Sequence, residues 1–151
     1  MLLLLAGFDY NNLSGTIWNI NSQSRTTTNP RTGTHSVDAT GGALQRDVGS
    51  NLATIIIGAA MFRTSAGAAG QFIGIRDSTS DQLTVNLNAD GSLEVRRGSS
   101  GGTLLGTSAT GVFPANVWNY VEIKATIDNT VGVFQLRING TTVLNLSGID
   151  T

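Results

Sequence analysis

The strongest fold signal lies near the C-terminus, where residues 118–144 read WNYVEIKATI, DNT, VGVFQLRI, NG and TTVL. In the first of these segments, apolar Val121, Ile123 and Ala125 alternate with polar and charged residues. Apolar and polar residues that alternate with a period of two are typical of an antiparallel strand with one buried and one solvated face. The segment 131–138 repeats the pattern, so the stretch predicts two neighbouring antiparallel strands.

A two-residue turn follows the second segment. Asn139-Gly140 stands directly before a third strand-like segment that begins at Thr141. An Asn-Gly pair between such segments is a strong hairpin signal, because a two-residue turn needs a positive φ at both central positions. The C-terminal part of the chain therefore predicts a three-stranded meander.

Short strand-like segments recur along the rest of the chain, with turn residues between them. Ala53–Phe62 is a long apolar run that predicts a central strand, and Asn88-Ala89-Asp90-Gly91 predicts a hairpin turn. The other strand-like segments are Leu2–Phe8, Gln71–Arg76, Gln82–Leu87, Ser92–Arg97 and Thr103–Thr107. No segment has a sustained helical period. We predict a single all-β domain, residues 1–151, built as an antiparallel sandwich or jelly roll.

Composition excludes several classes of protein. The net charge is −1, with nine basic and ten acidic residues, so there is no basic excess to bind a nucleic-acid backbone. The chain has no cysteine and therefore no disulfide framework or thiolate metal site. The opening run Met1–Phe8 is too short to span a membrane, and no positive charge precedes it as in a secretory signal. We expect neither nucleic acid nor a membrane as partner, and we interpret Leu2–Phe8 as a buried first strand.

Two motifs suggest a family. The segment DGSLEV at residues 90–95 resembles a signature of the concanavalin A-like lectin and glucanase superfamily. So does the later pattern W-x-Y-V-E at residues 118–122, followed by G-x-x-x-L-x-x-N-G-x-x-V at residues 132–143. Laminin G-like and pentraxin-like domains carry similar patterns. Three segments are more similar still to jelly-roll proteins predicted in the structural gene clusters of tailed phages: AGFD at residues 6–9, QLTVNLNADG at residues 82–91 and R-x-N-G-x-x-V-L-N-L-x-G-x-D-T at residues 137–151. The resemblance covers most of the chain and implies a concanavalin A-like antiparallel jelly-roll sandwich.

The resemblance to phage proteins also implies a function. It points to a non-enzymatic structural protein of the virion surface, a capsid decoration or a tail or fibre component, assembled in the host cytoplasm. Its partners would be copies of itself, in a homo-oligomer, or other virion proteins. Proteins of this kind usually continue past residue 151 with another strand. We therefore expect further residues or a neighbouring subunit to complete the sheet beside Leu2–Phe8.

The alternative function is a lectin-like carbohydrate-binding module used for adhesion to a host surface. Aromatic rings that stay exposed are the candidates for stacking on sugars. Trp18, in a polar stretch, and Tyr10 are the residues that we select for this role. Trp118, at the start of a strand, is expected to pack in the core, because a large aromatic side chain buries much area there.

The residues offer little for catalysis. Glucanases of this superfamily use two carboxylates that face each other, but the only glutamates, Glu94 and Glu122, have no acidic residue two positions away. The lone histidine, His35, precedes Ser36 and Asp38, but neighbours in a strand point to opposite faces. We predict that the protein is not an enzyme and has no catalytic residue.

Candidates for a metal site are equally sparse. Asp77 and Asp81 share one loop, and Asp128 and Asn129 share another. A hard cation needs several converging oxygen ligands, whereas aspartate and asparagine favour turns for local reasons. We therefore expect no metal site, with Asp77 and Asp81 as weak candidates, and no cofactor.

Overall fold

The computed structural model describes residues 19–21 and 23–151. All regular secondary structure in these residues is β-strand, and all strand pairs are antiparallel, which confirms the prediction of an all-β, antiparallel fold. The chain divides into two compact units, residues 1–51 and 52–151. The predicted first strand, Leu2–Phe8, lies outside the described residues.

The described part of the first unit contains two small sheets. In one, β1 (Asn19–Asn21) pairs with β4 (Ala43–Gln45), and in the other, β2 (Ser24–Thr26) pairs with β3 (Ser36–Asp38). Each strand has three residues, and most side chains from residue 23 to 51 are exposed. The buried core of the described chain therefore lies in the second unit.

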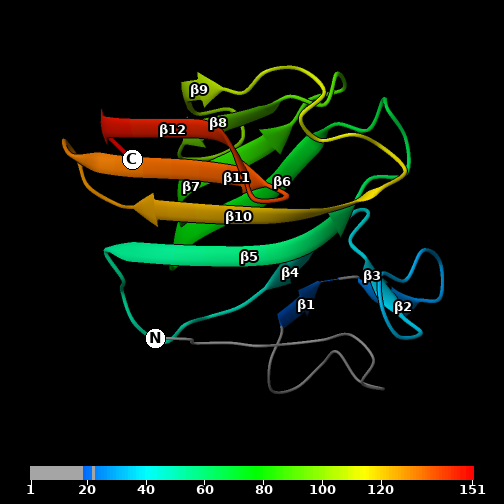
Figure 1. Cartoon of the computed structure of the whole chain (residues 1–151). Helices are drawn as coiled ribbons and strands as arrows, with labels where there is room; N and C mark the ends of the chain where they lie inside the picture. Colours follow the sequence, from blue (N-terminus) through cyan, green and yellow to red (C-terminus); the bar gives the residue numbers. More distant parts are fainter. Residues whose placement is uncertain (1–18, 22) are drawn as a thin grey trace. The chain divides into compact units, whose positions relative to one another are not determined.

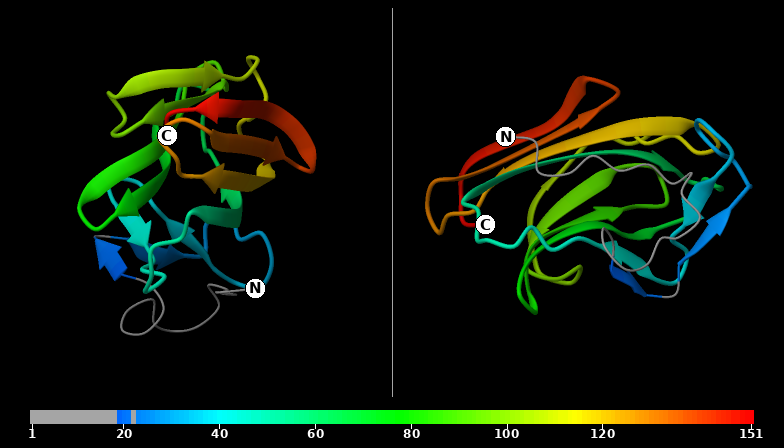
Figure 2. Two further views of the ribbon diagram at one scale, coloured as in Figure 1. Left: turned by 90° about the vertical axis from the view of Figure 1, so that its left-hand side faces the viewer. Right: turned by 90° about the horizontal axis from the view of Figure 1, so that it is seen from below.

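The second unit consists of two four-stranded antiparallel sheets, which Figures 1 and 2 show as two layers. The strand order is β12-β11-β10-β5 in the first sheet and β6-β7-β8-β9 in the second. The strands are β5 (Thr54–Phe62), β6 (Gly70–Asp77), β7 (Ser80–Leu87), β8 (Leu93–Arg97), β9 (Thr103–Thr107), β10 (Trp118–Thr126), β11 (Gly132–Ile138) and β12 (Thr141–Ile149). The chain crosses from one sheet to the other after β5 and returns after β9.

The C-terminal meander has the form that the sequence predicts. Asn139 and Gly140 connect β11 to β12 with φ values of 51° and 82°, as a two-residue hairpin turn requires. The side chains of β10 and β11 alternate between buried and more accessible positions. The second predicted hairpin also forms, because the Gly91 N–H donates to the Asn88 carbonyl at 3.0 Å and Gly91 has a φ of 81°.

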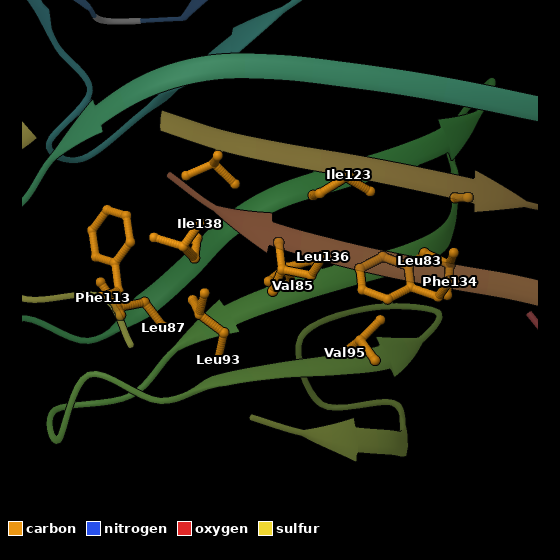
Figure 3. Close-up of a cluster of buried hydrophobic side chains, with 12 residues drawn as sticks. Leu83, Val85, Leu87, Leu93, Val95, Phe113, Ile123, Phe134, Leu136 and Ile138 are labelled. Atoms are coloured by element: carbon orange, nitrogen blue, oxygen red, sulfur yellow. The ribbon is translucent and has the colours of Figure 1, made fainter. Parts of the chain in front are cut away.

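The inner faces of the two sheets form one hydrophobic core, shown in Figure 3. The first sheet contributes Val121, Ile123, Ala125, Phe134, Leu136 and Ile138, and the second contributes Leu83, Val85, Leu87, Leu93 and Val95. Phe113, from the loop before β10, closes one end by packing edge-on against Phe72, with ring centroids 4.8 Å apart. Each fully buried large apolar side chain stabilises the fold by about 1.5–3 kcal/mol.

β5 confirms the strand that was predicted from Ala53–Phe62 but not its central position. Among the described strands, β5 pairs with β10 alone and forms one edge of its sheet. Its inner residues Ile55 and Ile57 are partly buried, and Ile55 packs against the core, whereas Ile56 on the outer face is 72% exposed. An unbroken apolar run indicates a central strand only where both of its faces are covered, and one face of β5 is open.

The two sheets of this unit are in contact along one pair of edges, β9 and β12, and differ along the other pair, β5 and β6. On one side, Gly106 of β9 lies against the side chains of Leu144 and Leu146 of β12, and Arg97 forms an ion pair with Asp150. These contacts join the edges of the two sheets. On the other side, the inner residues of the edge strands β5 and β6 are only partly buried, namely Ile55, Ile57, Met61, Phe72, Ile73 and Ile75.

Candidate functional site

The outer face of the β5–β10 pair gathers aromatic and exposed apolar side chains. The register places Trp118 opposite Phe62 and Tyr120 opposite Ala60. Because side chains alternate along a strand, these residues share the outer face with Ile56. We call the following set the β5–β10 outer surface: Ile56, Gly58, Ala60 and Phe62 of β5, with Trp118 and Tyr120 of β10.

Trp118 does not pack in the core, contrary to our expectation. Its ring is partly buried against Phe62, with ring centroids 5.6 Å apart and an interplanar angle of 51°. The neighbouring inward position is occupied by Asn119, which is 1% exposed and donates to two backbone carbonyls. Trp118 lies an even number of residues before Glu122, which the alternation had placed on the solvated face. The alternation in the sequence therefore already indicated that Trp118 lies on the outer face of β10.

Tyr120 leans across Gly58 of the neighbouring strand. A Cβ atom at Gly58 would collide with the Tyr120 hydroxyl oxygen and would lie 3.2 Å from Cζ. The absence of a side chain at Gly58 thus leaves room for the ring, whose hydroxyl lies over β5. Tyr120 is 40% exposed, so a ligand or a partner protein can reach its ring.

Charged groups continue the outer face beside this surface. Glu122 lies between Tyr120 and Lys124 on β10, and its carboxylate is 4.0 Å from the Arg137 guanidinium of β11. Both members of this pair are more than a third exposed, so their attraction contributes little to stability, about 0–1 kcal/mol. They remain accessible for polar contacts with a partner.

The backbone of β5 has an edge that no described strand covers. At the start of the ladder, the Ile127 N–H donates to the Ala53 carbonyl at 2.8 Å, and the register between β5 and β10 then has no shift. Because hydrogen-bonding direction alternates along an antiparallel strand, the odd-numbered residues of β5 bond to β10. The even-numbered residues direct their N–H and C=O groups away from β10. We call these five residues the β5 edge: Thr54, Ile56, Gly58, Ala60 and Phe62.

The other three sheet edges of the second unit are irregular. β12 and β6 each have two register shifts against their neighbours, and β9, with five residues, has one. Bulges and short edge strands are the usual means by which a sheet prevents another strand from adding to it. Within residues 52–151, β5 is therefore the one edge strand that is both long and regular.

The two glutamates occupy different sheets and do not form a catalytic pair. Glu94 of β8 accepts hydrogen bonds from the Arg96 guanidinium at 2.8 and 3.1 Å. Glu122 of β10 lies near Arg137. Each carboxylate thus has a cation as its neighbour, and their separate positions offer no acid and base facing one substrate.

The His35, Ser36 and Asp38 side chains are held by local contacts. The His35 Nδ1 atom lies 2.7 Å from the Thr34 hydroxyl. Ser36 donates to the Thr28 carbonyl at 2.8 Å, and Asp38 accepts from the Thr40 N–H at 2.8 Å. These bonds do not connect the three groups in the order that nucleophilic catalysis requires.

Two of the aspartates that were considered for metal binding, Asp81 and Asp128, bind other groups of the chain. Asp81 forms a 2.8 Å ion pair with Arg76, and Asp77 is at the end of β6. Asp128 accepts hydrogen bonds from its own turn, chiefly from the Val131 N–H, and these bonds lower the pKa of its carboxyl group. Across residues 19–21 and 23–151, no three histidine or acidic residues are grouped so that they could hold a metal ion.

Arg63 is a buried cation that the sequence reasoning missed. It follows β5 and is 8% exposed, and its Nη1 atom lies 3.4 Å from the carbonyl oxygens of Ala66, Asn88 and Ala89. It therefore ties the loop after β5 to the hairpin between β7 and β8. Its Nε atom is buried and has no acceptor among the described residues. Because its guanidinium binds carbonyls of two loops, we assign Arg63 a structural role.

The carbohydrate candidates Trp18 and Tyr10 lie outside the described residues.

Comparison of the chain with family models, with curated proteins and with solved structures gives no match. The part of the chain that the structure describes contains no helix long and apolar enough to cross a membrane. The β5 edge and the β5–β10 outer surface are thus the features on which a function can be argued.

Proposed function

We propose that this chain is a non-enzymatic structural protein that acts by binding copies of itself or other proteins of a larger particle. The observation that carries the proposal is the β5 edge. It belongs to a nine-residue strand with a regular register, and residues 53–62 include no charged residue. An uncharged, regular edge readily accepts another strand. The β5 edge is therefore suited to bind a strand of a partner protein.

The finer proposal is a concanavalin A-like jelly roll on the surface of a tailed-phage virion, as a capsid decoration or a tail or fibre component. The phage-like segment at residues 6–9 lies outside the described residues, and the other two lie in the second unit, one on β7 and the turn after it and one on the end of β11 and β12. The motifs of the superfamily lie in the same unit. DGSLEV spans the turn before β8 and most of β8, and the later motifs lie on the β10–β12 meander. A fold of this class hosts many functions, so the virion location rests on the resemblance of these motifs.

Self-association is the direct test. Sedimentation velocity over a hundredfold range of protein concentration should show oligomers at the upper end. A stable monomer throughout that range would contradict assembly with copies of itself. The genes on either side of this one provide a second test, because capsid, portal and tail genes are expected there.

A second candidate function is carbohydrate binding, and the β5–β10 outer surface favours it. The partly exposed rings of Trp118 and Tyr120 offer apolar faces on which a sugar ring can stack, and Glu122 and Arg137 lie close enough to bond its hydroxyl groups. Such a combination of aromatic faces with a few polar groups is typical of ligand sites. This surface adds Trp118 and Tyr120 to the candidates Trp18 and Tyr10, which lie outside the described residues.

A glycan array followed by calorimetry tests this alternative. Tyr120→Ala should reduce the affinity for a bound glycan at least tenfold, whereas Val131→Ala, at an exposed apolar residue outside the surface, should not. If the array shows no bound glycan, or if both variants bind equally well, this surface is not a carbohydrate site.

A further inference from the structure

We infer that two copies of the chain pair through the β5 edge, antiparallel about a two-fold axis at Gly58. Their β12-β11-β10-β5 sheets would then join into one continuous sheet. This inference rests on the proposed assembly function and specifies its partner, a second copy of the chain.

The β5 edge is complementary to itself. With the axis at Gly58, Ile56 meets Ala60 of the partner subunit, and Thr54 meets Phe62 of the partner subunit. Gly58, the middle one of the five edge residues, meets its own counterpart. Each backbone N–H or C=O group that points away from β10 in one copy thus faces such a group of the β5 edge in the other copy. All five edge residues of each copy therefore form hydrogen-bonded pairs.

The side chains at this edge permit the approach. Gly58 and Ala60 are small, and Ile56, 72% exposed in the single chain, would pack against Ala60 of the partner subunit. The Tyr120 hydroxyl lies over Gly58, so one such group from each copy would flank the axis. Pairing would therefore cover the most exposed of the large apolar side chains in the described residues.

Charge and size are compatible with a dimer. No charged residue occurs between residues 53 and 62, and Glu122 and Lys124 are set back by one strand, about 4.8 Å. Two copies therefore meet without direct like-charge repulsion. The nine-residue strand is about 30 Å long, so pairing along this edge alone forms a small contact, whereas stable specific complexes bury at least about 1,000 Å². We expect an association that depends on concentration.

The second copy is the occupant that the sheet edges favour. The edges formed by β6, β9 and β12 all have register shifts, so none offers a matching regular strand. Within residues 52–151, the regular edge that a second copy can offer to β5 is therefore the β5 strand of that second copy.

Cysteine cross-linking tests this arrangement in the full chain, which has no native cysteine. The test protein is the double variant Ile56→Cys/Ala60→Cys. Within one copy these residues are four apart along a strand, about 13 Å, too far for a disulfide. Across the axis they form a hydrogen-bonded pair with Cα atoms about 5.5 Å apart, which a disulfide can span.

On mild oxidation, the double variant should run as a covalent dimer on a non-reducing gel. Each single variant should remain largely monomeric, because residue 56 lies about 13 Å from its own counterpart across the axis. Ile56→Lys should weaken self-association at least tenfold in sedimentation, while the matched Ile56→Thr should have little effect. Circular dichroism of every variant establishes that it is folded.

The outcomes separate this inference from the proposed function. Oligomers in the parent chain without a cross-link in the double variant would overturn β5 pairing and leave the assembly function standing. A parent chain that is monomeric at all concentrations would overturn β5 pairing and assembly with copies of itself, and would leave only binding to other proteins of a larger particle. A covalent dimer in the double variant alone, together with weaker association of Ile56→Lys, supports the pairing.

Discussion

The side-chain amide of Asn139 donates a hydrogen bond to the Oδ1 atom of Asn119 at 3.1 Å. Asn139 occupies the turn between β11 and β12, and Asn119 is buried at the start of β10. The Oδ1 atom of Asn139 in turn accepts from the Tyr120 N–H at 2.8 Å, and its backbone N–H donates to the Tyr120 carbonyl at 2.8 Å. One turn residue thus fixes the beginning of the strand that carries the β5–β10 outer surface.

Replacement of Asn139 should destabilise the protein through this contact. Asn139→Ala leaves the buried Asn119 oxygen without its donor and places alanine, which tolerates positive φ less well than asparagine, in the turn, for a combined loss of about 2–4 kcal/mol. Asn139→Gly removes the same side chain but tolerates the positive φ, so its loss should be smaller by about 1 kcal/mol. Urea unfolding measures both. If either variant matched exposed Asn145→Ala on β12, the contact would have no energetic role.

Arg63 should matter more to stability than any exposed arginine. Arg63→Ala removes the donor for three loop carbonyls and opens a space at the end of the core, so we expect a loss of about 2–4 kcal/mol. Arg63→Lys should recover only part of this loss, because an ammonium group lacks the planar fork of donors. The control is Arg76→Ala, at an exposed ion pair, with an expected loss of about 0–1 kcal/mol. Equal losses for both alanine variants would contradict the role of Arg63.

Alternation predicted the parts of the fold in which one face is buried and the other is wet. Val121, Ile123 and Ala125 are each at most 1% exposed, as their spacing indicates. The same rule predicts an exposed side chain for Thr84, which lies on the outer face of β7. Thr84 is instead fully buried. Its hydroxyl donates to the Gly98 carbonyl at 2.7 Å, because the loop after β8 folds back over that strand. No local pattern reports such a loop.

The candidate surface was only partly predictable. The position of Glu122 on the solvated face implied the same face for Trp118 and Tyr120, but the size of Trp118 favoured a core position. Which strand neighbours β10 is a long-range property, and nothing near Trp118 in the sequence names Phe62 as its partner. The exposed edge of β5 was missed for the same reason, since an apolar sequence does not reveal whether a strand pairs on one side or two.

Thr151 should stabilise the turn between β10 and β11. It is 5% exposed; its N–H donates to the Asp128 carbonyl at 3.1 Å, and its hydroxyl oxygen accepts from the Asp128 N–H at 2.9 Å. Thr151→Val preserves the shape but leaves that N–H without its acceptor, so we expect a loss of about 1–3 kcal/mol in chemical unfolding. Thr142→Val, at an exposed position of β12, serves as the matched control. A loss no larger than that of the control would show that the hydroxyl contributes nothing.

The same turn should make stability depend on pH. The carboxylate of Asp128 accepts from the Val131 N–H at 2.9 Å, and from the N–H and hydroxyl of Thr130 at 2.8 and 3.1 Å. These bonds, with that from the Val131 N–H first, lower the pKa of Asp128 below its ordinary value. The unfolded chain therefore takes up the proton more readily than the folded protein. The stability that the charged group supplies is complete above the unfolded pKa, about 3.9, and is lost as the pH falls through the lower, folded pKa.

The variant Asp128→Asn isolates this effect. It retains an oxygen acceptor for the turn but does not titrate, so its urea midpoint should fall less than that of the parent as the pH is lowered from about 5 to about 3. Asp77→Asn, at an exposed aspartate at the end of β6, is the matched control for the loss of one charge. Asp90 should still contribute to the acid sensitivity of both proteins, because the Ser92 backbone N–H lowers the pKa of its carboxyl group as well. The expected signature is thus a shallower pH dependence in Asp128→Asn, and an unchanged slope would show that the Asp128 carboxylate does not stabilise the turn through its charge.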